Sequence, residues 1–273
     1  MVNEIKITED EFGQMATLMK ETYGINLTQK KNLISGRLQN HLHKSNYDSF
    51  SDFYKDILTD KTGEALTVLL NKLTTNHTYF MREMEHFDFF KSTVLPFILE
   101  TEKNKDMRIW SAGCSSGEEP YMIAMILADH FGANKAGWDT SILATDISDR
   151  VLSMAADGKY MSEDLNVLPD MWRRKYFAKS DGDREQISAN IRNNVIFKKF
   201  NLMTKTLPFK KKFHIIWCRN VMIYFDAQTK RELVERFYDH TVPGGFLFIG
   251  HSESLGRGET RYRYVEPAIY RKE

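Results

Sequence analysis

The sequence predicts an α/β protein in which a mostly parallel sheet with helices follows a small all-helical domain. Three observations support this prediction. Apolar residues recur at helical spacing up to about residue 74, and from residue 107 short apolar runs alternate with helical stretches. The composition, 42% hydrophobic and 27% charged over 273 residues, is that of an ordinary globular protein.

The helical domain has recognisable helix starts. Thr8 followed by Glu11 predicts a capping box at the first helix, and Thr28 is expected to cap the second. Two further helices are expected at about 48–59 and 62–74. We expect the helical domain, a linker that contributes to the functional site, and the sheet domain at residues 1–74, 75–84 and 85–273.

The sheet domain is predicted from apolar runs of strand length. These runs are MRIWSA, SILATDI, NVIFKKF, FHIIWCRN and GFLFIGH, and RYRYVEPAIYRK is expected to add one final antiparallel strand. Helices are expected at about 85–101, 119–131, 148–157 and 227–240. A polar stretch at about 172–194, with Asp181–Gly182 as its turn, predicts a small antiparallel β insertion.

Charge and cysteine content limit the function classes. A net charge of +1 favours neither nucleic acid nor a membrane surface as partner, and no run reaches the roughly 18–20 apolar residues of a membrane span. Two cysteines and a start without signal-peptide features predict a cytoplasmic protein. The eight histidines show no metal-ligand spacing, so we predict no metal. Nothing indicates an obligate oligomer, and a monomer is expected.

The stretch SAGCSSGEEPY, residues 111–121, joins a predicted strand to a predicted helix. Open α/β sheets bind their ligands at such carboxyl ends of strands. The glycines, Gly113 and Gly117, follow G-x-x-x-G rather than the dinucleotide G-x-G-x-x-G, and Glu118 and Glu119 disfavour a pyrophosphate. Carboxylates favour a cationic ligand without phosphate. S-adenosylmethionine, with its sulfonium and ammonium groups, fits that description.

Three more predicted strands end in polar residues. Asp146 ends the second run and can accept hydrogen bonds from a ribose; the third and fourth are followed by Asn201–Leu202 and by Asn220 with Tyr224. Each feature has a simpler explanation: a glycine loop can be only a turn, Asp146 a helix cap, and the glutamates favourable charges at a helix start. Four successive strands that all end in polar residues are stronger evidence for a binding site than any single one of these features.

These motifs together resemble the chemotaxis receptor glutamate O-methyltransferases, the CheR family. TTNHTYFMRE, SAGCSSGEEPYMIAM, ATDIS, FNL, CRNVMIYF and GFLFIGHSES follow in the family's order over nearly the whole chain. The resemblance implies a Rossmann-like S-adenosylmethionine-dependent methyltransferase domain with a small antiparallel β insertion, preceded by a small all-α domain. It also implies methyl transfer from S-adenosylmethionine to glutamate side chains on cytoplasmic helices of chemoreceptors, with S-adenosylhomocysteine as the product.

The resemblance further implies the cofactor-binding residues. Glu119 would meet the methionyl end, Asp146 the ribose, and Asn201 with Leu202 the adenine. The full expected set is Asn76, Thr78, Arg82, Gly113, Glu119, Asp146, Asn201, Leu202, Asn220 and Val221.

The chemistry of a glutamate acceptor agrees with this reading. Its side chain, with a pKa of about 4.3, is already ionised at neutral pH and needs no general base. The enzyme must orient the carboxylate towards the methyl group. We hypothesise that the fork of Arg82 holds that carboxylate, with Tyr224 as a hydrogen-bond partner. The alternative is that Arg82 forms only a structural salt bridge, for instance with Glu119.

A basic stripe offers a candidate surface for the receptor. Residues 22–47 contain no acid, and on an ideal helix four basic side chains fall within an arc of about 60°: Lys30, Arg37, His41 and Lys44. Acidic receptor helices suit such a stripe, but a solvated helix face explains it equally well. In some family members the β insertion binds a tether peptide at the receptor C-terminus. The hairpin here is short, so we expect no tether binding.

Other function classes compete with this interpretation. One is a methyltransferase for another target, which TTNHTYFMRE and the helical domain disfavour. Another is a non-catalytic module that senses S-adenosylmethionine or S-adenosylhomocysteine. A nicotinamide dehydrogenase is disfavoured by the missing G-x-G-x-x-G.

Overall fold

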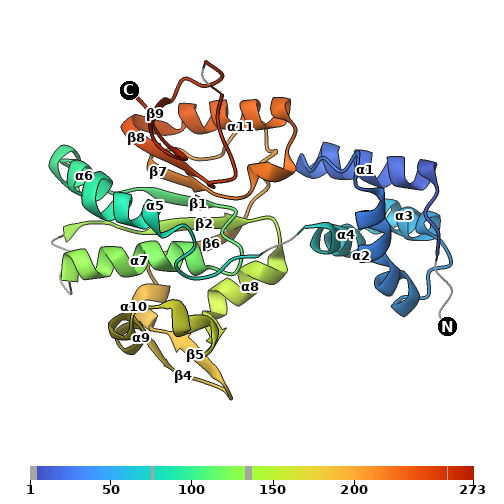
Figure 1. Ribbon diagram of the computed structural model, residues 1–273, viewed down its shortest axis with the longest axis horizontal. Coiled ribbons are helices and arrows are strands. Elements are labelled where there is room, and N and C mark those ends of the chain that lie inside the picture. The colour runs from blue at the N-terminus through green and yellow to red at the C-terminus, as the bar shows by residue number, and fades with distance from the viewer. Residues whose placement is uncertain (1–4, 75–76, 133–136, 257) are drawn as a thin grey trace. The chain divides into compact units, whose positions relative to one another are not determined.

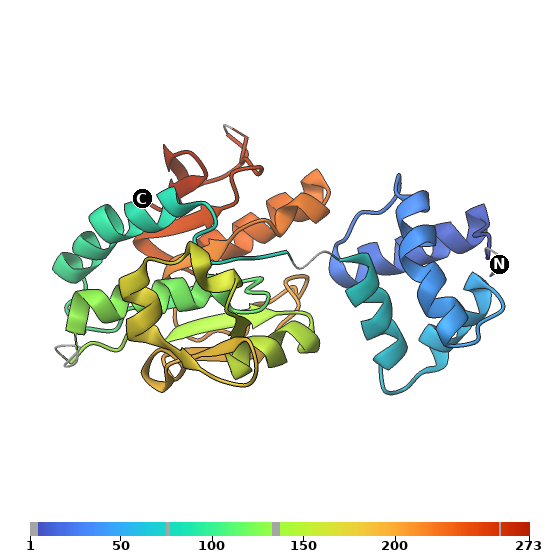
Figure 2. The same cartoon turned by 60° about the horizontal axis from the view of Figure 1, so that its bottom comes forward.

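The computed structural model describes residues 5–74, 77–132, 137–256 and 258–273. The chain divides into two compact units, which Figure 1 and Figure 2 show from two directions. The first unit comprises Met1–Thr75 with Tyr224–Thr229, and the second comprises Asn76–Ile223 with Lys230–Glu273. That residues 75–84 act as a linker stays a prediction.

The first unit is built from four helices among its described residues: α1 Glu9–Tyr23, α2 Lys31–Lys44, α3 Phe50–Thr59 and α4 Glu64–Leu73. The capping box of Thr8 and Glu11 at α1 is confirmed, and the second oxygen of Glu11 accepts the amide of Ser51, 2.8 Å away. The prediction for Thr28 is wrong. Lys30 is the N-cap of α2, and the Thr28 hydroxyl bonds to Asn26 instead, because Asn26 offers a carboxamide oxygen two residues back.

The second unit contains a seven-stranded sheet with strand order β6-β2-β1-β7-β8-β10-β9. Its strands are β1 Ile109–Ala112, β2 Ile142–Asp146, β6 Val195–Lys199, β7 Phe213–Cys218, β8 Thr241–Ile249, β9 Arg263–Glu266 and β10 Ile269–Arg271. Strands β6, β2, β1, β7 and β8 are parallel to one another. The expected single final strand is wrong: the chain turns at Ala268, which has a left-handed φ of 62°, and forms the antiparallel pair β9 and β10.

The strand order reverses between β1 and β7. From β1 the chain proceeds outward to β2 and β6, then returns to the other side of β1 as β7 and continues to β8. Ile109 therefore pairs with Ile142 on one side and Ile215 on the other. At such a switch point the loops after the two central strands diverge and leave room for a ligand.

Helices cover both faces of this sheet. They are α5 Met84–Phe89, the π-helix η1 Phe90–Val94, α6 Leu95–Thr101, α7 Glu118–Phe131, α8 Asp149–Asp157 and α11 Ala227–Asp239, preceded by the 3-10 turn η4 Met222–Tyr224. In Figure 1, α11 and α7 lie on opposite sides of the sheet. Phe237 of α11 meets Trp110 edge to face, with ring centroids 5.3 Å apart. The helix expected at 85–101 changes to a π-helical turn just before Pro96, which has no N–H to donate.

A small antiparallel sheet with strand order β3-β5-β4 completes the second unit. Its elements are β3 Lys159–Met161, the 3-10 helix η3 Asp164–Val167, α9 Asp170–Tyr176, β4 Phe177–Lys179, β5 Arg184–Ile187 and α10 Ala189–Arg192. Strands β4 and β5 form the predicted hairpin, and Gly182 in its turn has a φ of 59°. The predicted fold class is therefore confirmed. Over the described residues, every helix is too short or too polar to cross a membrane.

Candidate active site

The loops that follow β1 and β7 touch at the switch point. Gly113 has a φ of +94°, and a Cβ added there would lie 2.4 Å from Cγ2 of Val221. Only glycine fits this position, because both the backbone conformation and the space exclude a side chain. The amides of Gly113 and Cys114 donate to the carbonyl of Thr145, at 2.8 and 2.9 Å. The loop after β1 is thus fixed to the end of β2 on one side and to Val221 on the other.

Glu119 lies in the first turn of α7 and points back to the end of the sheet. Its Oε1 accepts the Ser111 hydroxyl at 2.7 Å, and its Oε2 accepts Nη1 of Arg219 at 3.1 Å. Burial raises the pKa of Glu119 above its ordinary value, although the charge of Arg219 opposes this. Arg219, rather than Arg82, is therefore the cation that pairs with Glu119.

Arg219 also reaches the segment that leads into α5. Its Nε and Nη2 lie 3.2 and 3.1 Å from Oε2 of Glu83, and Nη2 also donates to the carbonyl of Arg82. The side chain of Arg219 is only 3% exposed, and its guanidinium lies over the Phe87 ring, 5.3 Å from the centroid. Although burial works in the opposite direction, Arg219 and the other hydrogen bonds lower the pKa of Glu83.

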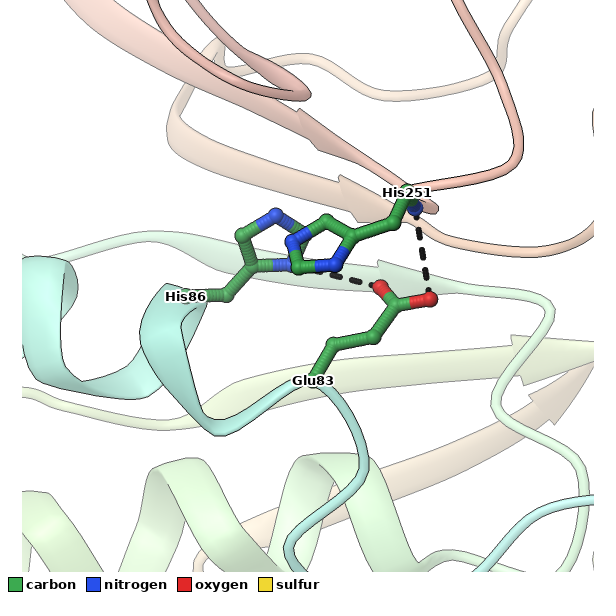
Figure 3. Close-up of side chains that lie close together, drawn as sticks. All are labelled: Glu83, His86 and His251. Carbon is green, nitrogen blue, oxygen red and sulfur yellow. Dashed lines mark hydrogen bonds and ion pairs between the residues drawn. The ribbon is translucent and has the colours of Figure 1, made fainter.

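Figure 3 shows Glu83 beside His86 and His251. The ligand atoms of these three residues lie within 4.8 Å of one another, close enough to be considered for a metal ion. Both Glu83 oxygens already have partners, however, since Oε1 accepts the His251 amide and Nδ2 of Asn220, each at 3.2 Å, and Oε2 accepts Arg219. Burial, aided by Arg219, lowers the pKa of His86 to about 4, so its ring is neutral. Because the Glu83 oxygens are occupied by Arg219, Asn220 and the His251 amide, we assign the cluster no metal.

Glu253 orders the loop after β7. Its Oε2 accepts the amides of Asn220 and Gly250, at 3.0 and 2.6 Å, and its Oε1 accepts the amide of Ile223 at 3.1 Å. These bonds hold Asn220 in the left-handed region, with φ at 58°. A Cβ at Gly250 would lie 2.4 Å from Nδ2 of Asn220, so this glycine is required for the close approach.

Asp146 joins the loops after β1 and β2. Its two oxygens accept the amides of Ser115 and Ser148, at 2.9 and 3.0 Å, and burial raises the pKa of this carboxyl. Ser148 is the N-cap residue of α8, so Asp146 orders the start of that helix. The contact of Asp146 with a ribose stays a prediction.

Glu118, whose role the sequence leaves open, is buried and accepts the Ser116 hydroxyl on both oxygens, at 2.9 and 2.8 Å.

The loop after β6 lies beside the end of β2. The amide of Phe200 donates to the carbonyl of Asp146 at 2.9 Å. Asn201 accepts the amide of Met203 at 2.9 Å, and the carbonyl of buried Leu202 accepts Nη2 of Arg236 at 2.8 Å. The loops with the predicted adenine and ribose residues are therefore neighbours, as their order in the sheet requires.

The residues of TTNHTYFMRE are placed less completely. Asn76 lies outside the described residues, and Thr78 is partly buried. Nη1 of Arg82 donates to the carbonyl of His77 at 2.6 Å, and its guanidinium lies 5.8 Å from the centroid of the Tyr79 ring. Tyr224 groups with the first unit, where its carbonyl accepts the amide of Asn26 at 2.8 Å. The partnership of Arg82 with Tyr224 stays a prediction.

The basic stripe on α2 is less uniform than the sequence suggests. Nη1 of Arg37 donates to the carbonyl of Leu73 at the end of α4, 3.1 Å away. The His41 ring meets Phe53 edge to face at 5.0 Å, and burial, together with the charge of Lys72, lowers its pKa. Lys30 and Lys44 are exposed.

The sequence did not identify three residues of this site: Glu83, Arg219 and Glu253. Each stands in a quoted motif, at the end of TTNHTYFMRE, in CRNVMIYF and in GHSES. A signal was present, because an arginine directly after an apolar strand and a glutamate after a glycine both need buried partners. Apart from Gly250, which bonds to Glu253, the partners described above lie thirty or more residues away, so spacing alone does not reveal them.

The arrangement fits a cationic, nucleoside-bearing cofactor. Glu83 and Glu119 share one guanidinium, which leaves an excess of negative charge, and the buried carboxyl of Asp146 adds to it. A phosphate would be repelled here, whereas a sulfonium would be attracted. Doubly wound sheets bind their ligands at this switch point, and the charge of the loop favours S-adenosylmethionine over a dinucleotide, which indicates the class of S-adenosylmethionine-dependent proteins.

Comparison with known proteins agrees with this class of protein and identifies the family. Residues 76–270 match the family model described as CheR methyltransferase, SAM binding domain, and residues 10–74 match CheR methyltransferase, all-alpha domain. The chain belongs to the CheR methyltransferase family and is an S-adenosylmethionine-dependent enzyme.

Curated relatives match along almost their whole length. The chain is 42% identical to a chemotaxis protein methyltransferase of Borreliella burgdorferi over 273 residues, covering 98% of this chain and 96% of the relative. It is 35% identical over 258 residues to chemotaxis protein methyltransferase 2 of Vibrio cholerae, covering 94% and 89%. It is 32% identical over 276 residues to the chemotaxis protein methyltransferase of Escherichia coli K12, covering 99% and 93%.

Proposed function

We propose that this enzyme transfers a methyl group from S-adenosylmethionine to glutamate side-chain carboxylates of chemoreceptors, giving glutamyl methyl esters in sensory adaptation. The observation that carries the proposal is the placement of Arg82. Its main chain is bonded to Arg219, which in turn holds Glu119 at the cofactor loops. Its guanidinium donates to a main-chain carbonyl, so among the described residues the group is not committed to a protein carboxylate.

The cofactor, when bound, supplies an electrophilic methyl group on its sulfonium. Glu119, Asp146, and the loop at Asn201–Leu202 would hold it, with Asn76, Thr78, Asn220 and Val221 completing the site. The acceptor carboxylate is ionised at neutral pH, so the protein has no proton to remove. What remains is orientation, and the Arg82 fork can grip one carboxylate oxygen while the other stays available for attack. Tyr224 would add a hydrogen bond.

The relatives named as chemotaxis protein methyltransferases support chemoreceptors as the partner. We propose that the acidic helices of such receptors dock on the basic side chains of α2, and that the enzyme works as a cytoplasmic monomer. Exposed Lys30 and Lys44 can supply charge to this contact. Arg37 and His41 also serve the packing of their own unit, so their share should be smaller.

The direct experiment is to incubate the enzyme with methyl-labelled S-adenosylmethionine and receptor-bearing membranes. A glutamyl methyl ester hydrolyses in alkali, so the label should be released as methanol by base. Membranes whose receptors carry glutamine or alanine at the methylated positions provide the control and should take up little label. Label that resists base would indicate another acceptor and contradict the proposal.

The small antiparallel sheet bears on whether this enzyme binds a receptor tether peptide. The β4–β5 hairpin has strands of only three and four residues. We propose that this member does not use a receptor tether peptide, and calorimetry with such a pentapeptide should give no measurable heat of binding. A complex of micromolar affinity would contradict this.

A further inference from the structure

We infer that Arg219 is a positioning residue for the proposed methyl transfer. It fixes the main chain at Arg82–Glu83 against the glycine loop, and so determines where the Arg82 guanidinium can hold the acceptor. The catalytic consequence of this inference rests on the proposed function, whereas the contacts of Arg219 are independent of that function.

One side chain joins three segments that are far apart in the sequence. Arg219 lies 136 residues from Glu83 and 100 residues from Glu119, and it bonds to both carboxylates at 3.1 Å. Its Nη2 also donates to the carbonyl of Arg82. Arg219 therefore links the Arg82–Glu83 main chain to the start of α7, where Glu119 also keeps its bond to Ser111.

The surroundings of Arg219 allow one orientation of the guanidinium. The group lies over the rings of Phe87 and Trp217, at 5.3 and 5.7 Å from their centroids. Trp217 is itself stacked on Phe248 at 4.1 Å. A buried guanidinium is stable only if its donors are matched, and here Nε, Nη1 and Nη2 all have acceptors. Lysine keeps the charge but has no planar fork, so it cannot reproduce these bonds.

The segment that Arg219 holds is strained. Glu83 and Met81 have left-handed φ values of 52° and 67°, which cost energy in residues other than glycine. Such a conformation persists only where the surroundings fix it. Arg219 and Asn220 hold the Glu83 carboxylate, and the Arg82 carbonyl between the two strained residues accepts Arg219. Without Arg219 the main chain at Arg82 should relax.

The inference is tested with Arg219→Lys and Arg219→Met, and with Arg174→Met as the matched control. Arg174 is 84% exposed and lies on α9, away from these contacts. We measure kcat, the KM values for cofactor and receptor, and hydrogen–deuterium exchange in peptides covering residues 77–89. For Arg219→Lys we expect kcat to fall by about 30- to 100-fold with the cofactor KM within about threefold. Exchange around residues 81–86 should be faster, and Arg174→Met should match the wild type.

A second variant keeps the test decisive if Arg219→Met does not fold. Glu83→Gln removes one charge from the Arg219 contact and leaves Glu119 in place, so it should show the same selective loss in kcat. An unchanged kcat in Arg219→Lys would overturn the inference. A fall in kcat matched by an equal loss of S-adenosylhomocysteine binding would also overturn it, because Arg219 would then act on cofactor binding alone.

The failure of the inference and that of the proposed function remain distinguishable. If the wild type gave no base-labile label, the proposed acceptor would be wrong. The exchange comparison would still decide whether Arg219 orders residues 81–86, since it needs no acceptor. Equal exchange in the wild type and Arg219→Lys would overturn the positioning inference even if glutamate methylation were established.

Discussion

Two arginines of similar appearance in the sequence have different surroundings in the two units. Arg219, at the carboxyl edge of the sheet, is 3% exposed and bonds to carboxylates from two distant segments. Arg37, on α2, donates to the carbonyls of Leu73 and Lys72 where α4 ends. The first holds functional loops together, whereas the second closes a helix terminus. Charge patterns along a chain do not distinguish these roles, because burial and partners decide them.

The largest effect that would test this comparison is expected at Arg82, the cation that Arg219 holds in place. Arg82→Ala should lower kcat by about 100- to 1000-fold, because the acceptor carboxylate loses its fork. Arg82→Lys should recover only part of this. Steady-state kinetics with receptor membranes measure both. Near-wild-type turnover in Arg82→Ala would mean that the residue is structural.

Two glycines, one in each unit, should respond in opposite ways to substitution by alanine. Gly113→Ala should destabilise the protein by about 2–4 kcal/mol and weaken cofactor binding at least tenfold, since Val221 fills the space and φ is +94°. Gly36, within α2, has nothing within 4 Å of an added Cβ. Gly36→Ala should therefore stabilise the protein by about 0.5–1 kcal/mol. Urea unfolding and calorimetry check both, and a tolerated alanine at residue 113 would refute the close contact.

Glu118 provides a pH-dependent test of burial at the sheet edge. Burial raises its folded-state pKa from 4.5 to about 7, so the folded protein binds more protons than the unfolded chain between those values. Its contribution to stability is complete below pH 4.5 and is lost as the pH rises through about 7. Glu118→Gln cannot ionise. It should raise the free energy of unfolding by on the order of 1–3 kcal/mol at pH 8, and by much less at pH 5. An equal change at both pH values would contradict this.

The smallest effect is expected on α2. Lys44→Glu should raise the KM for receptor by about three- to tenfold and leave cofactor binding unchanged, because the side chain is exposed. Arg37→Gln, unlike Lys44→Glu, should also lower the free energy of unfolding, since Arg37 bonds to the end of α4. If Lys44→Glu left the receptor KM at the wild-type value, the stripe would be a solvated face.

Local patterns predicted much of this molecule. Strand and helix positions followed from periodicity, and the capping box of Thr8 and Glu11 followed from the spacing of two residues. The carboxyl ends of the strands also indicated the loops of the site, because parallel strands bring those ends to one edge.

What escaped prediction depends on long-range packing. The sequence does not show that Arg219 pairs with Glu83 and Glu119, because these contacts form only when three segments fold together. The π-helical turn before Pro96 and the hairpin at Ala268 escaped for a related reason. Each replaces a regular element by a local alternative of similar energy, and tertiary contacts select between them.

The measurement that tests the central claim most directly is a crystal structure of the enzyme with S-adenosylhomocysteine. We predict the ligand at the carboxyl ends of β1 and β7, with the ribose at Asp146, the methionyl end near Glu119, and the Arg219 contacts to Glu83 intact. A ligand bound elsewhere on the sheet, or one that separates Arg219 from Glu83 and Glu119, would contradict it.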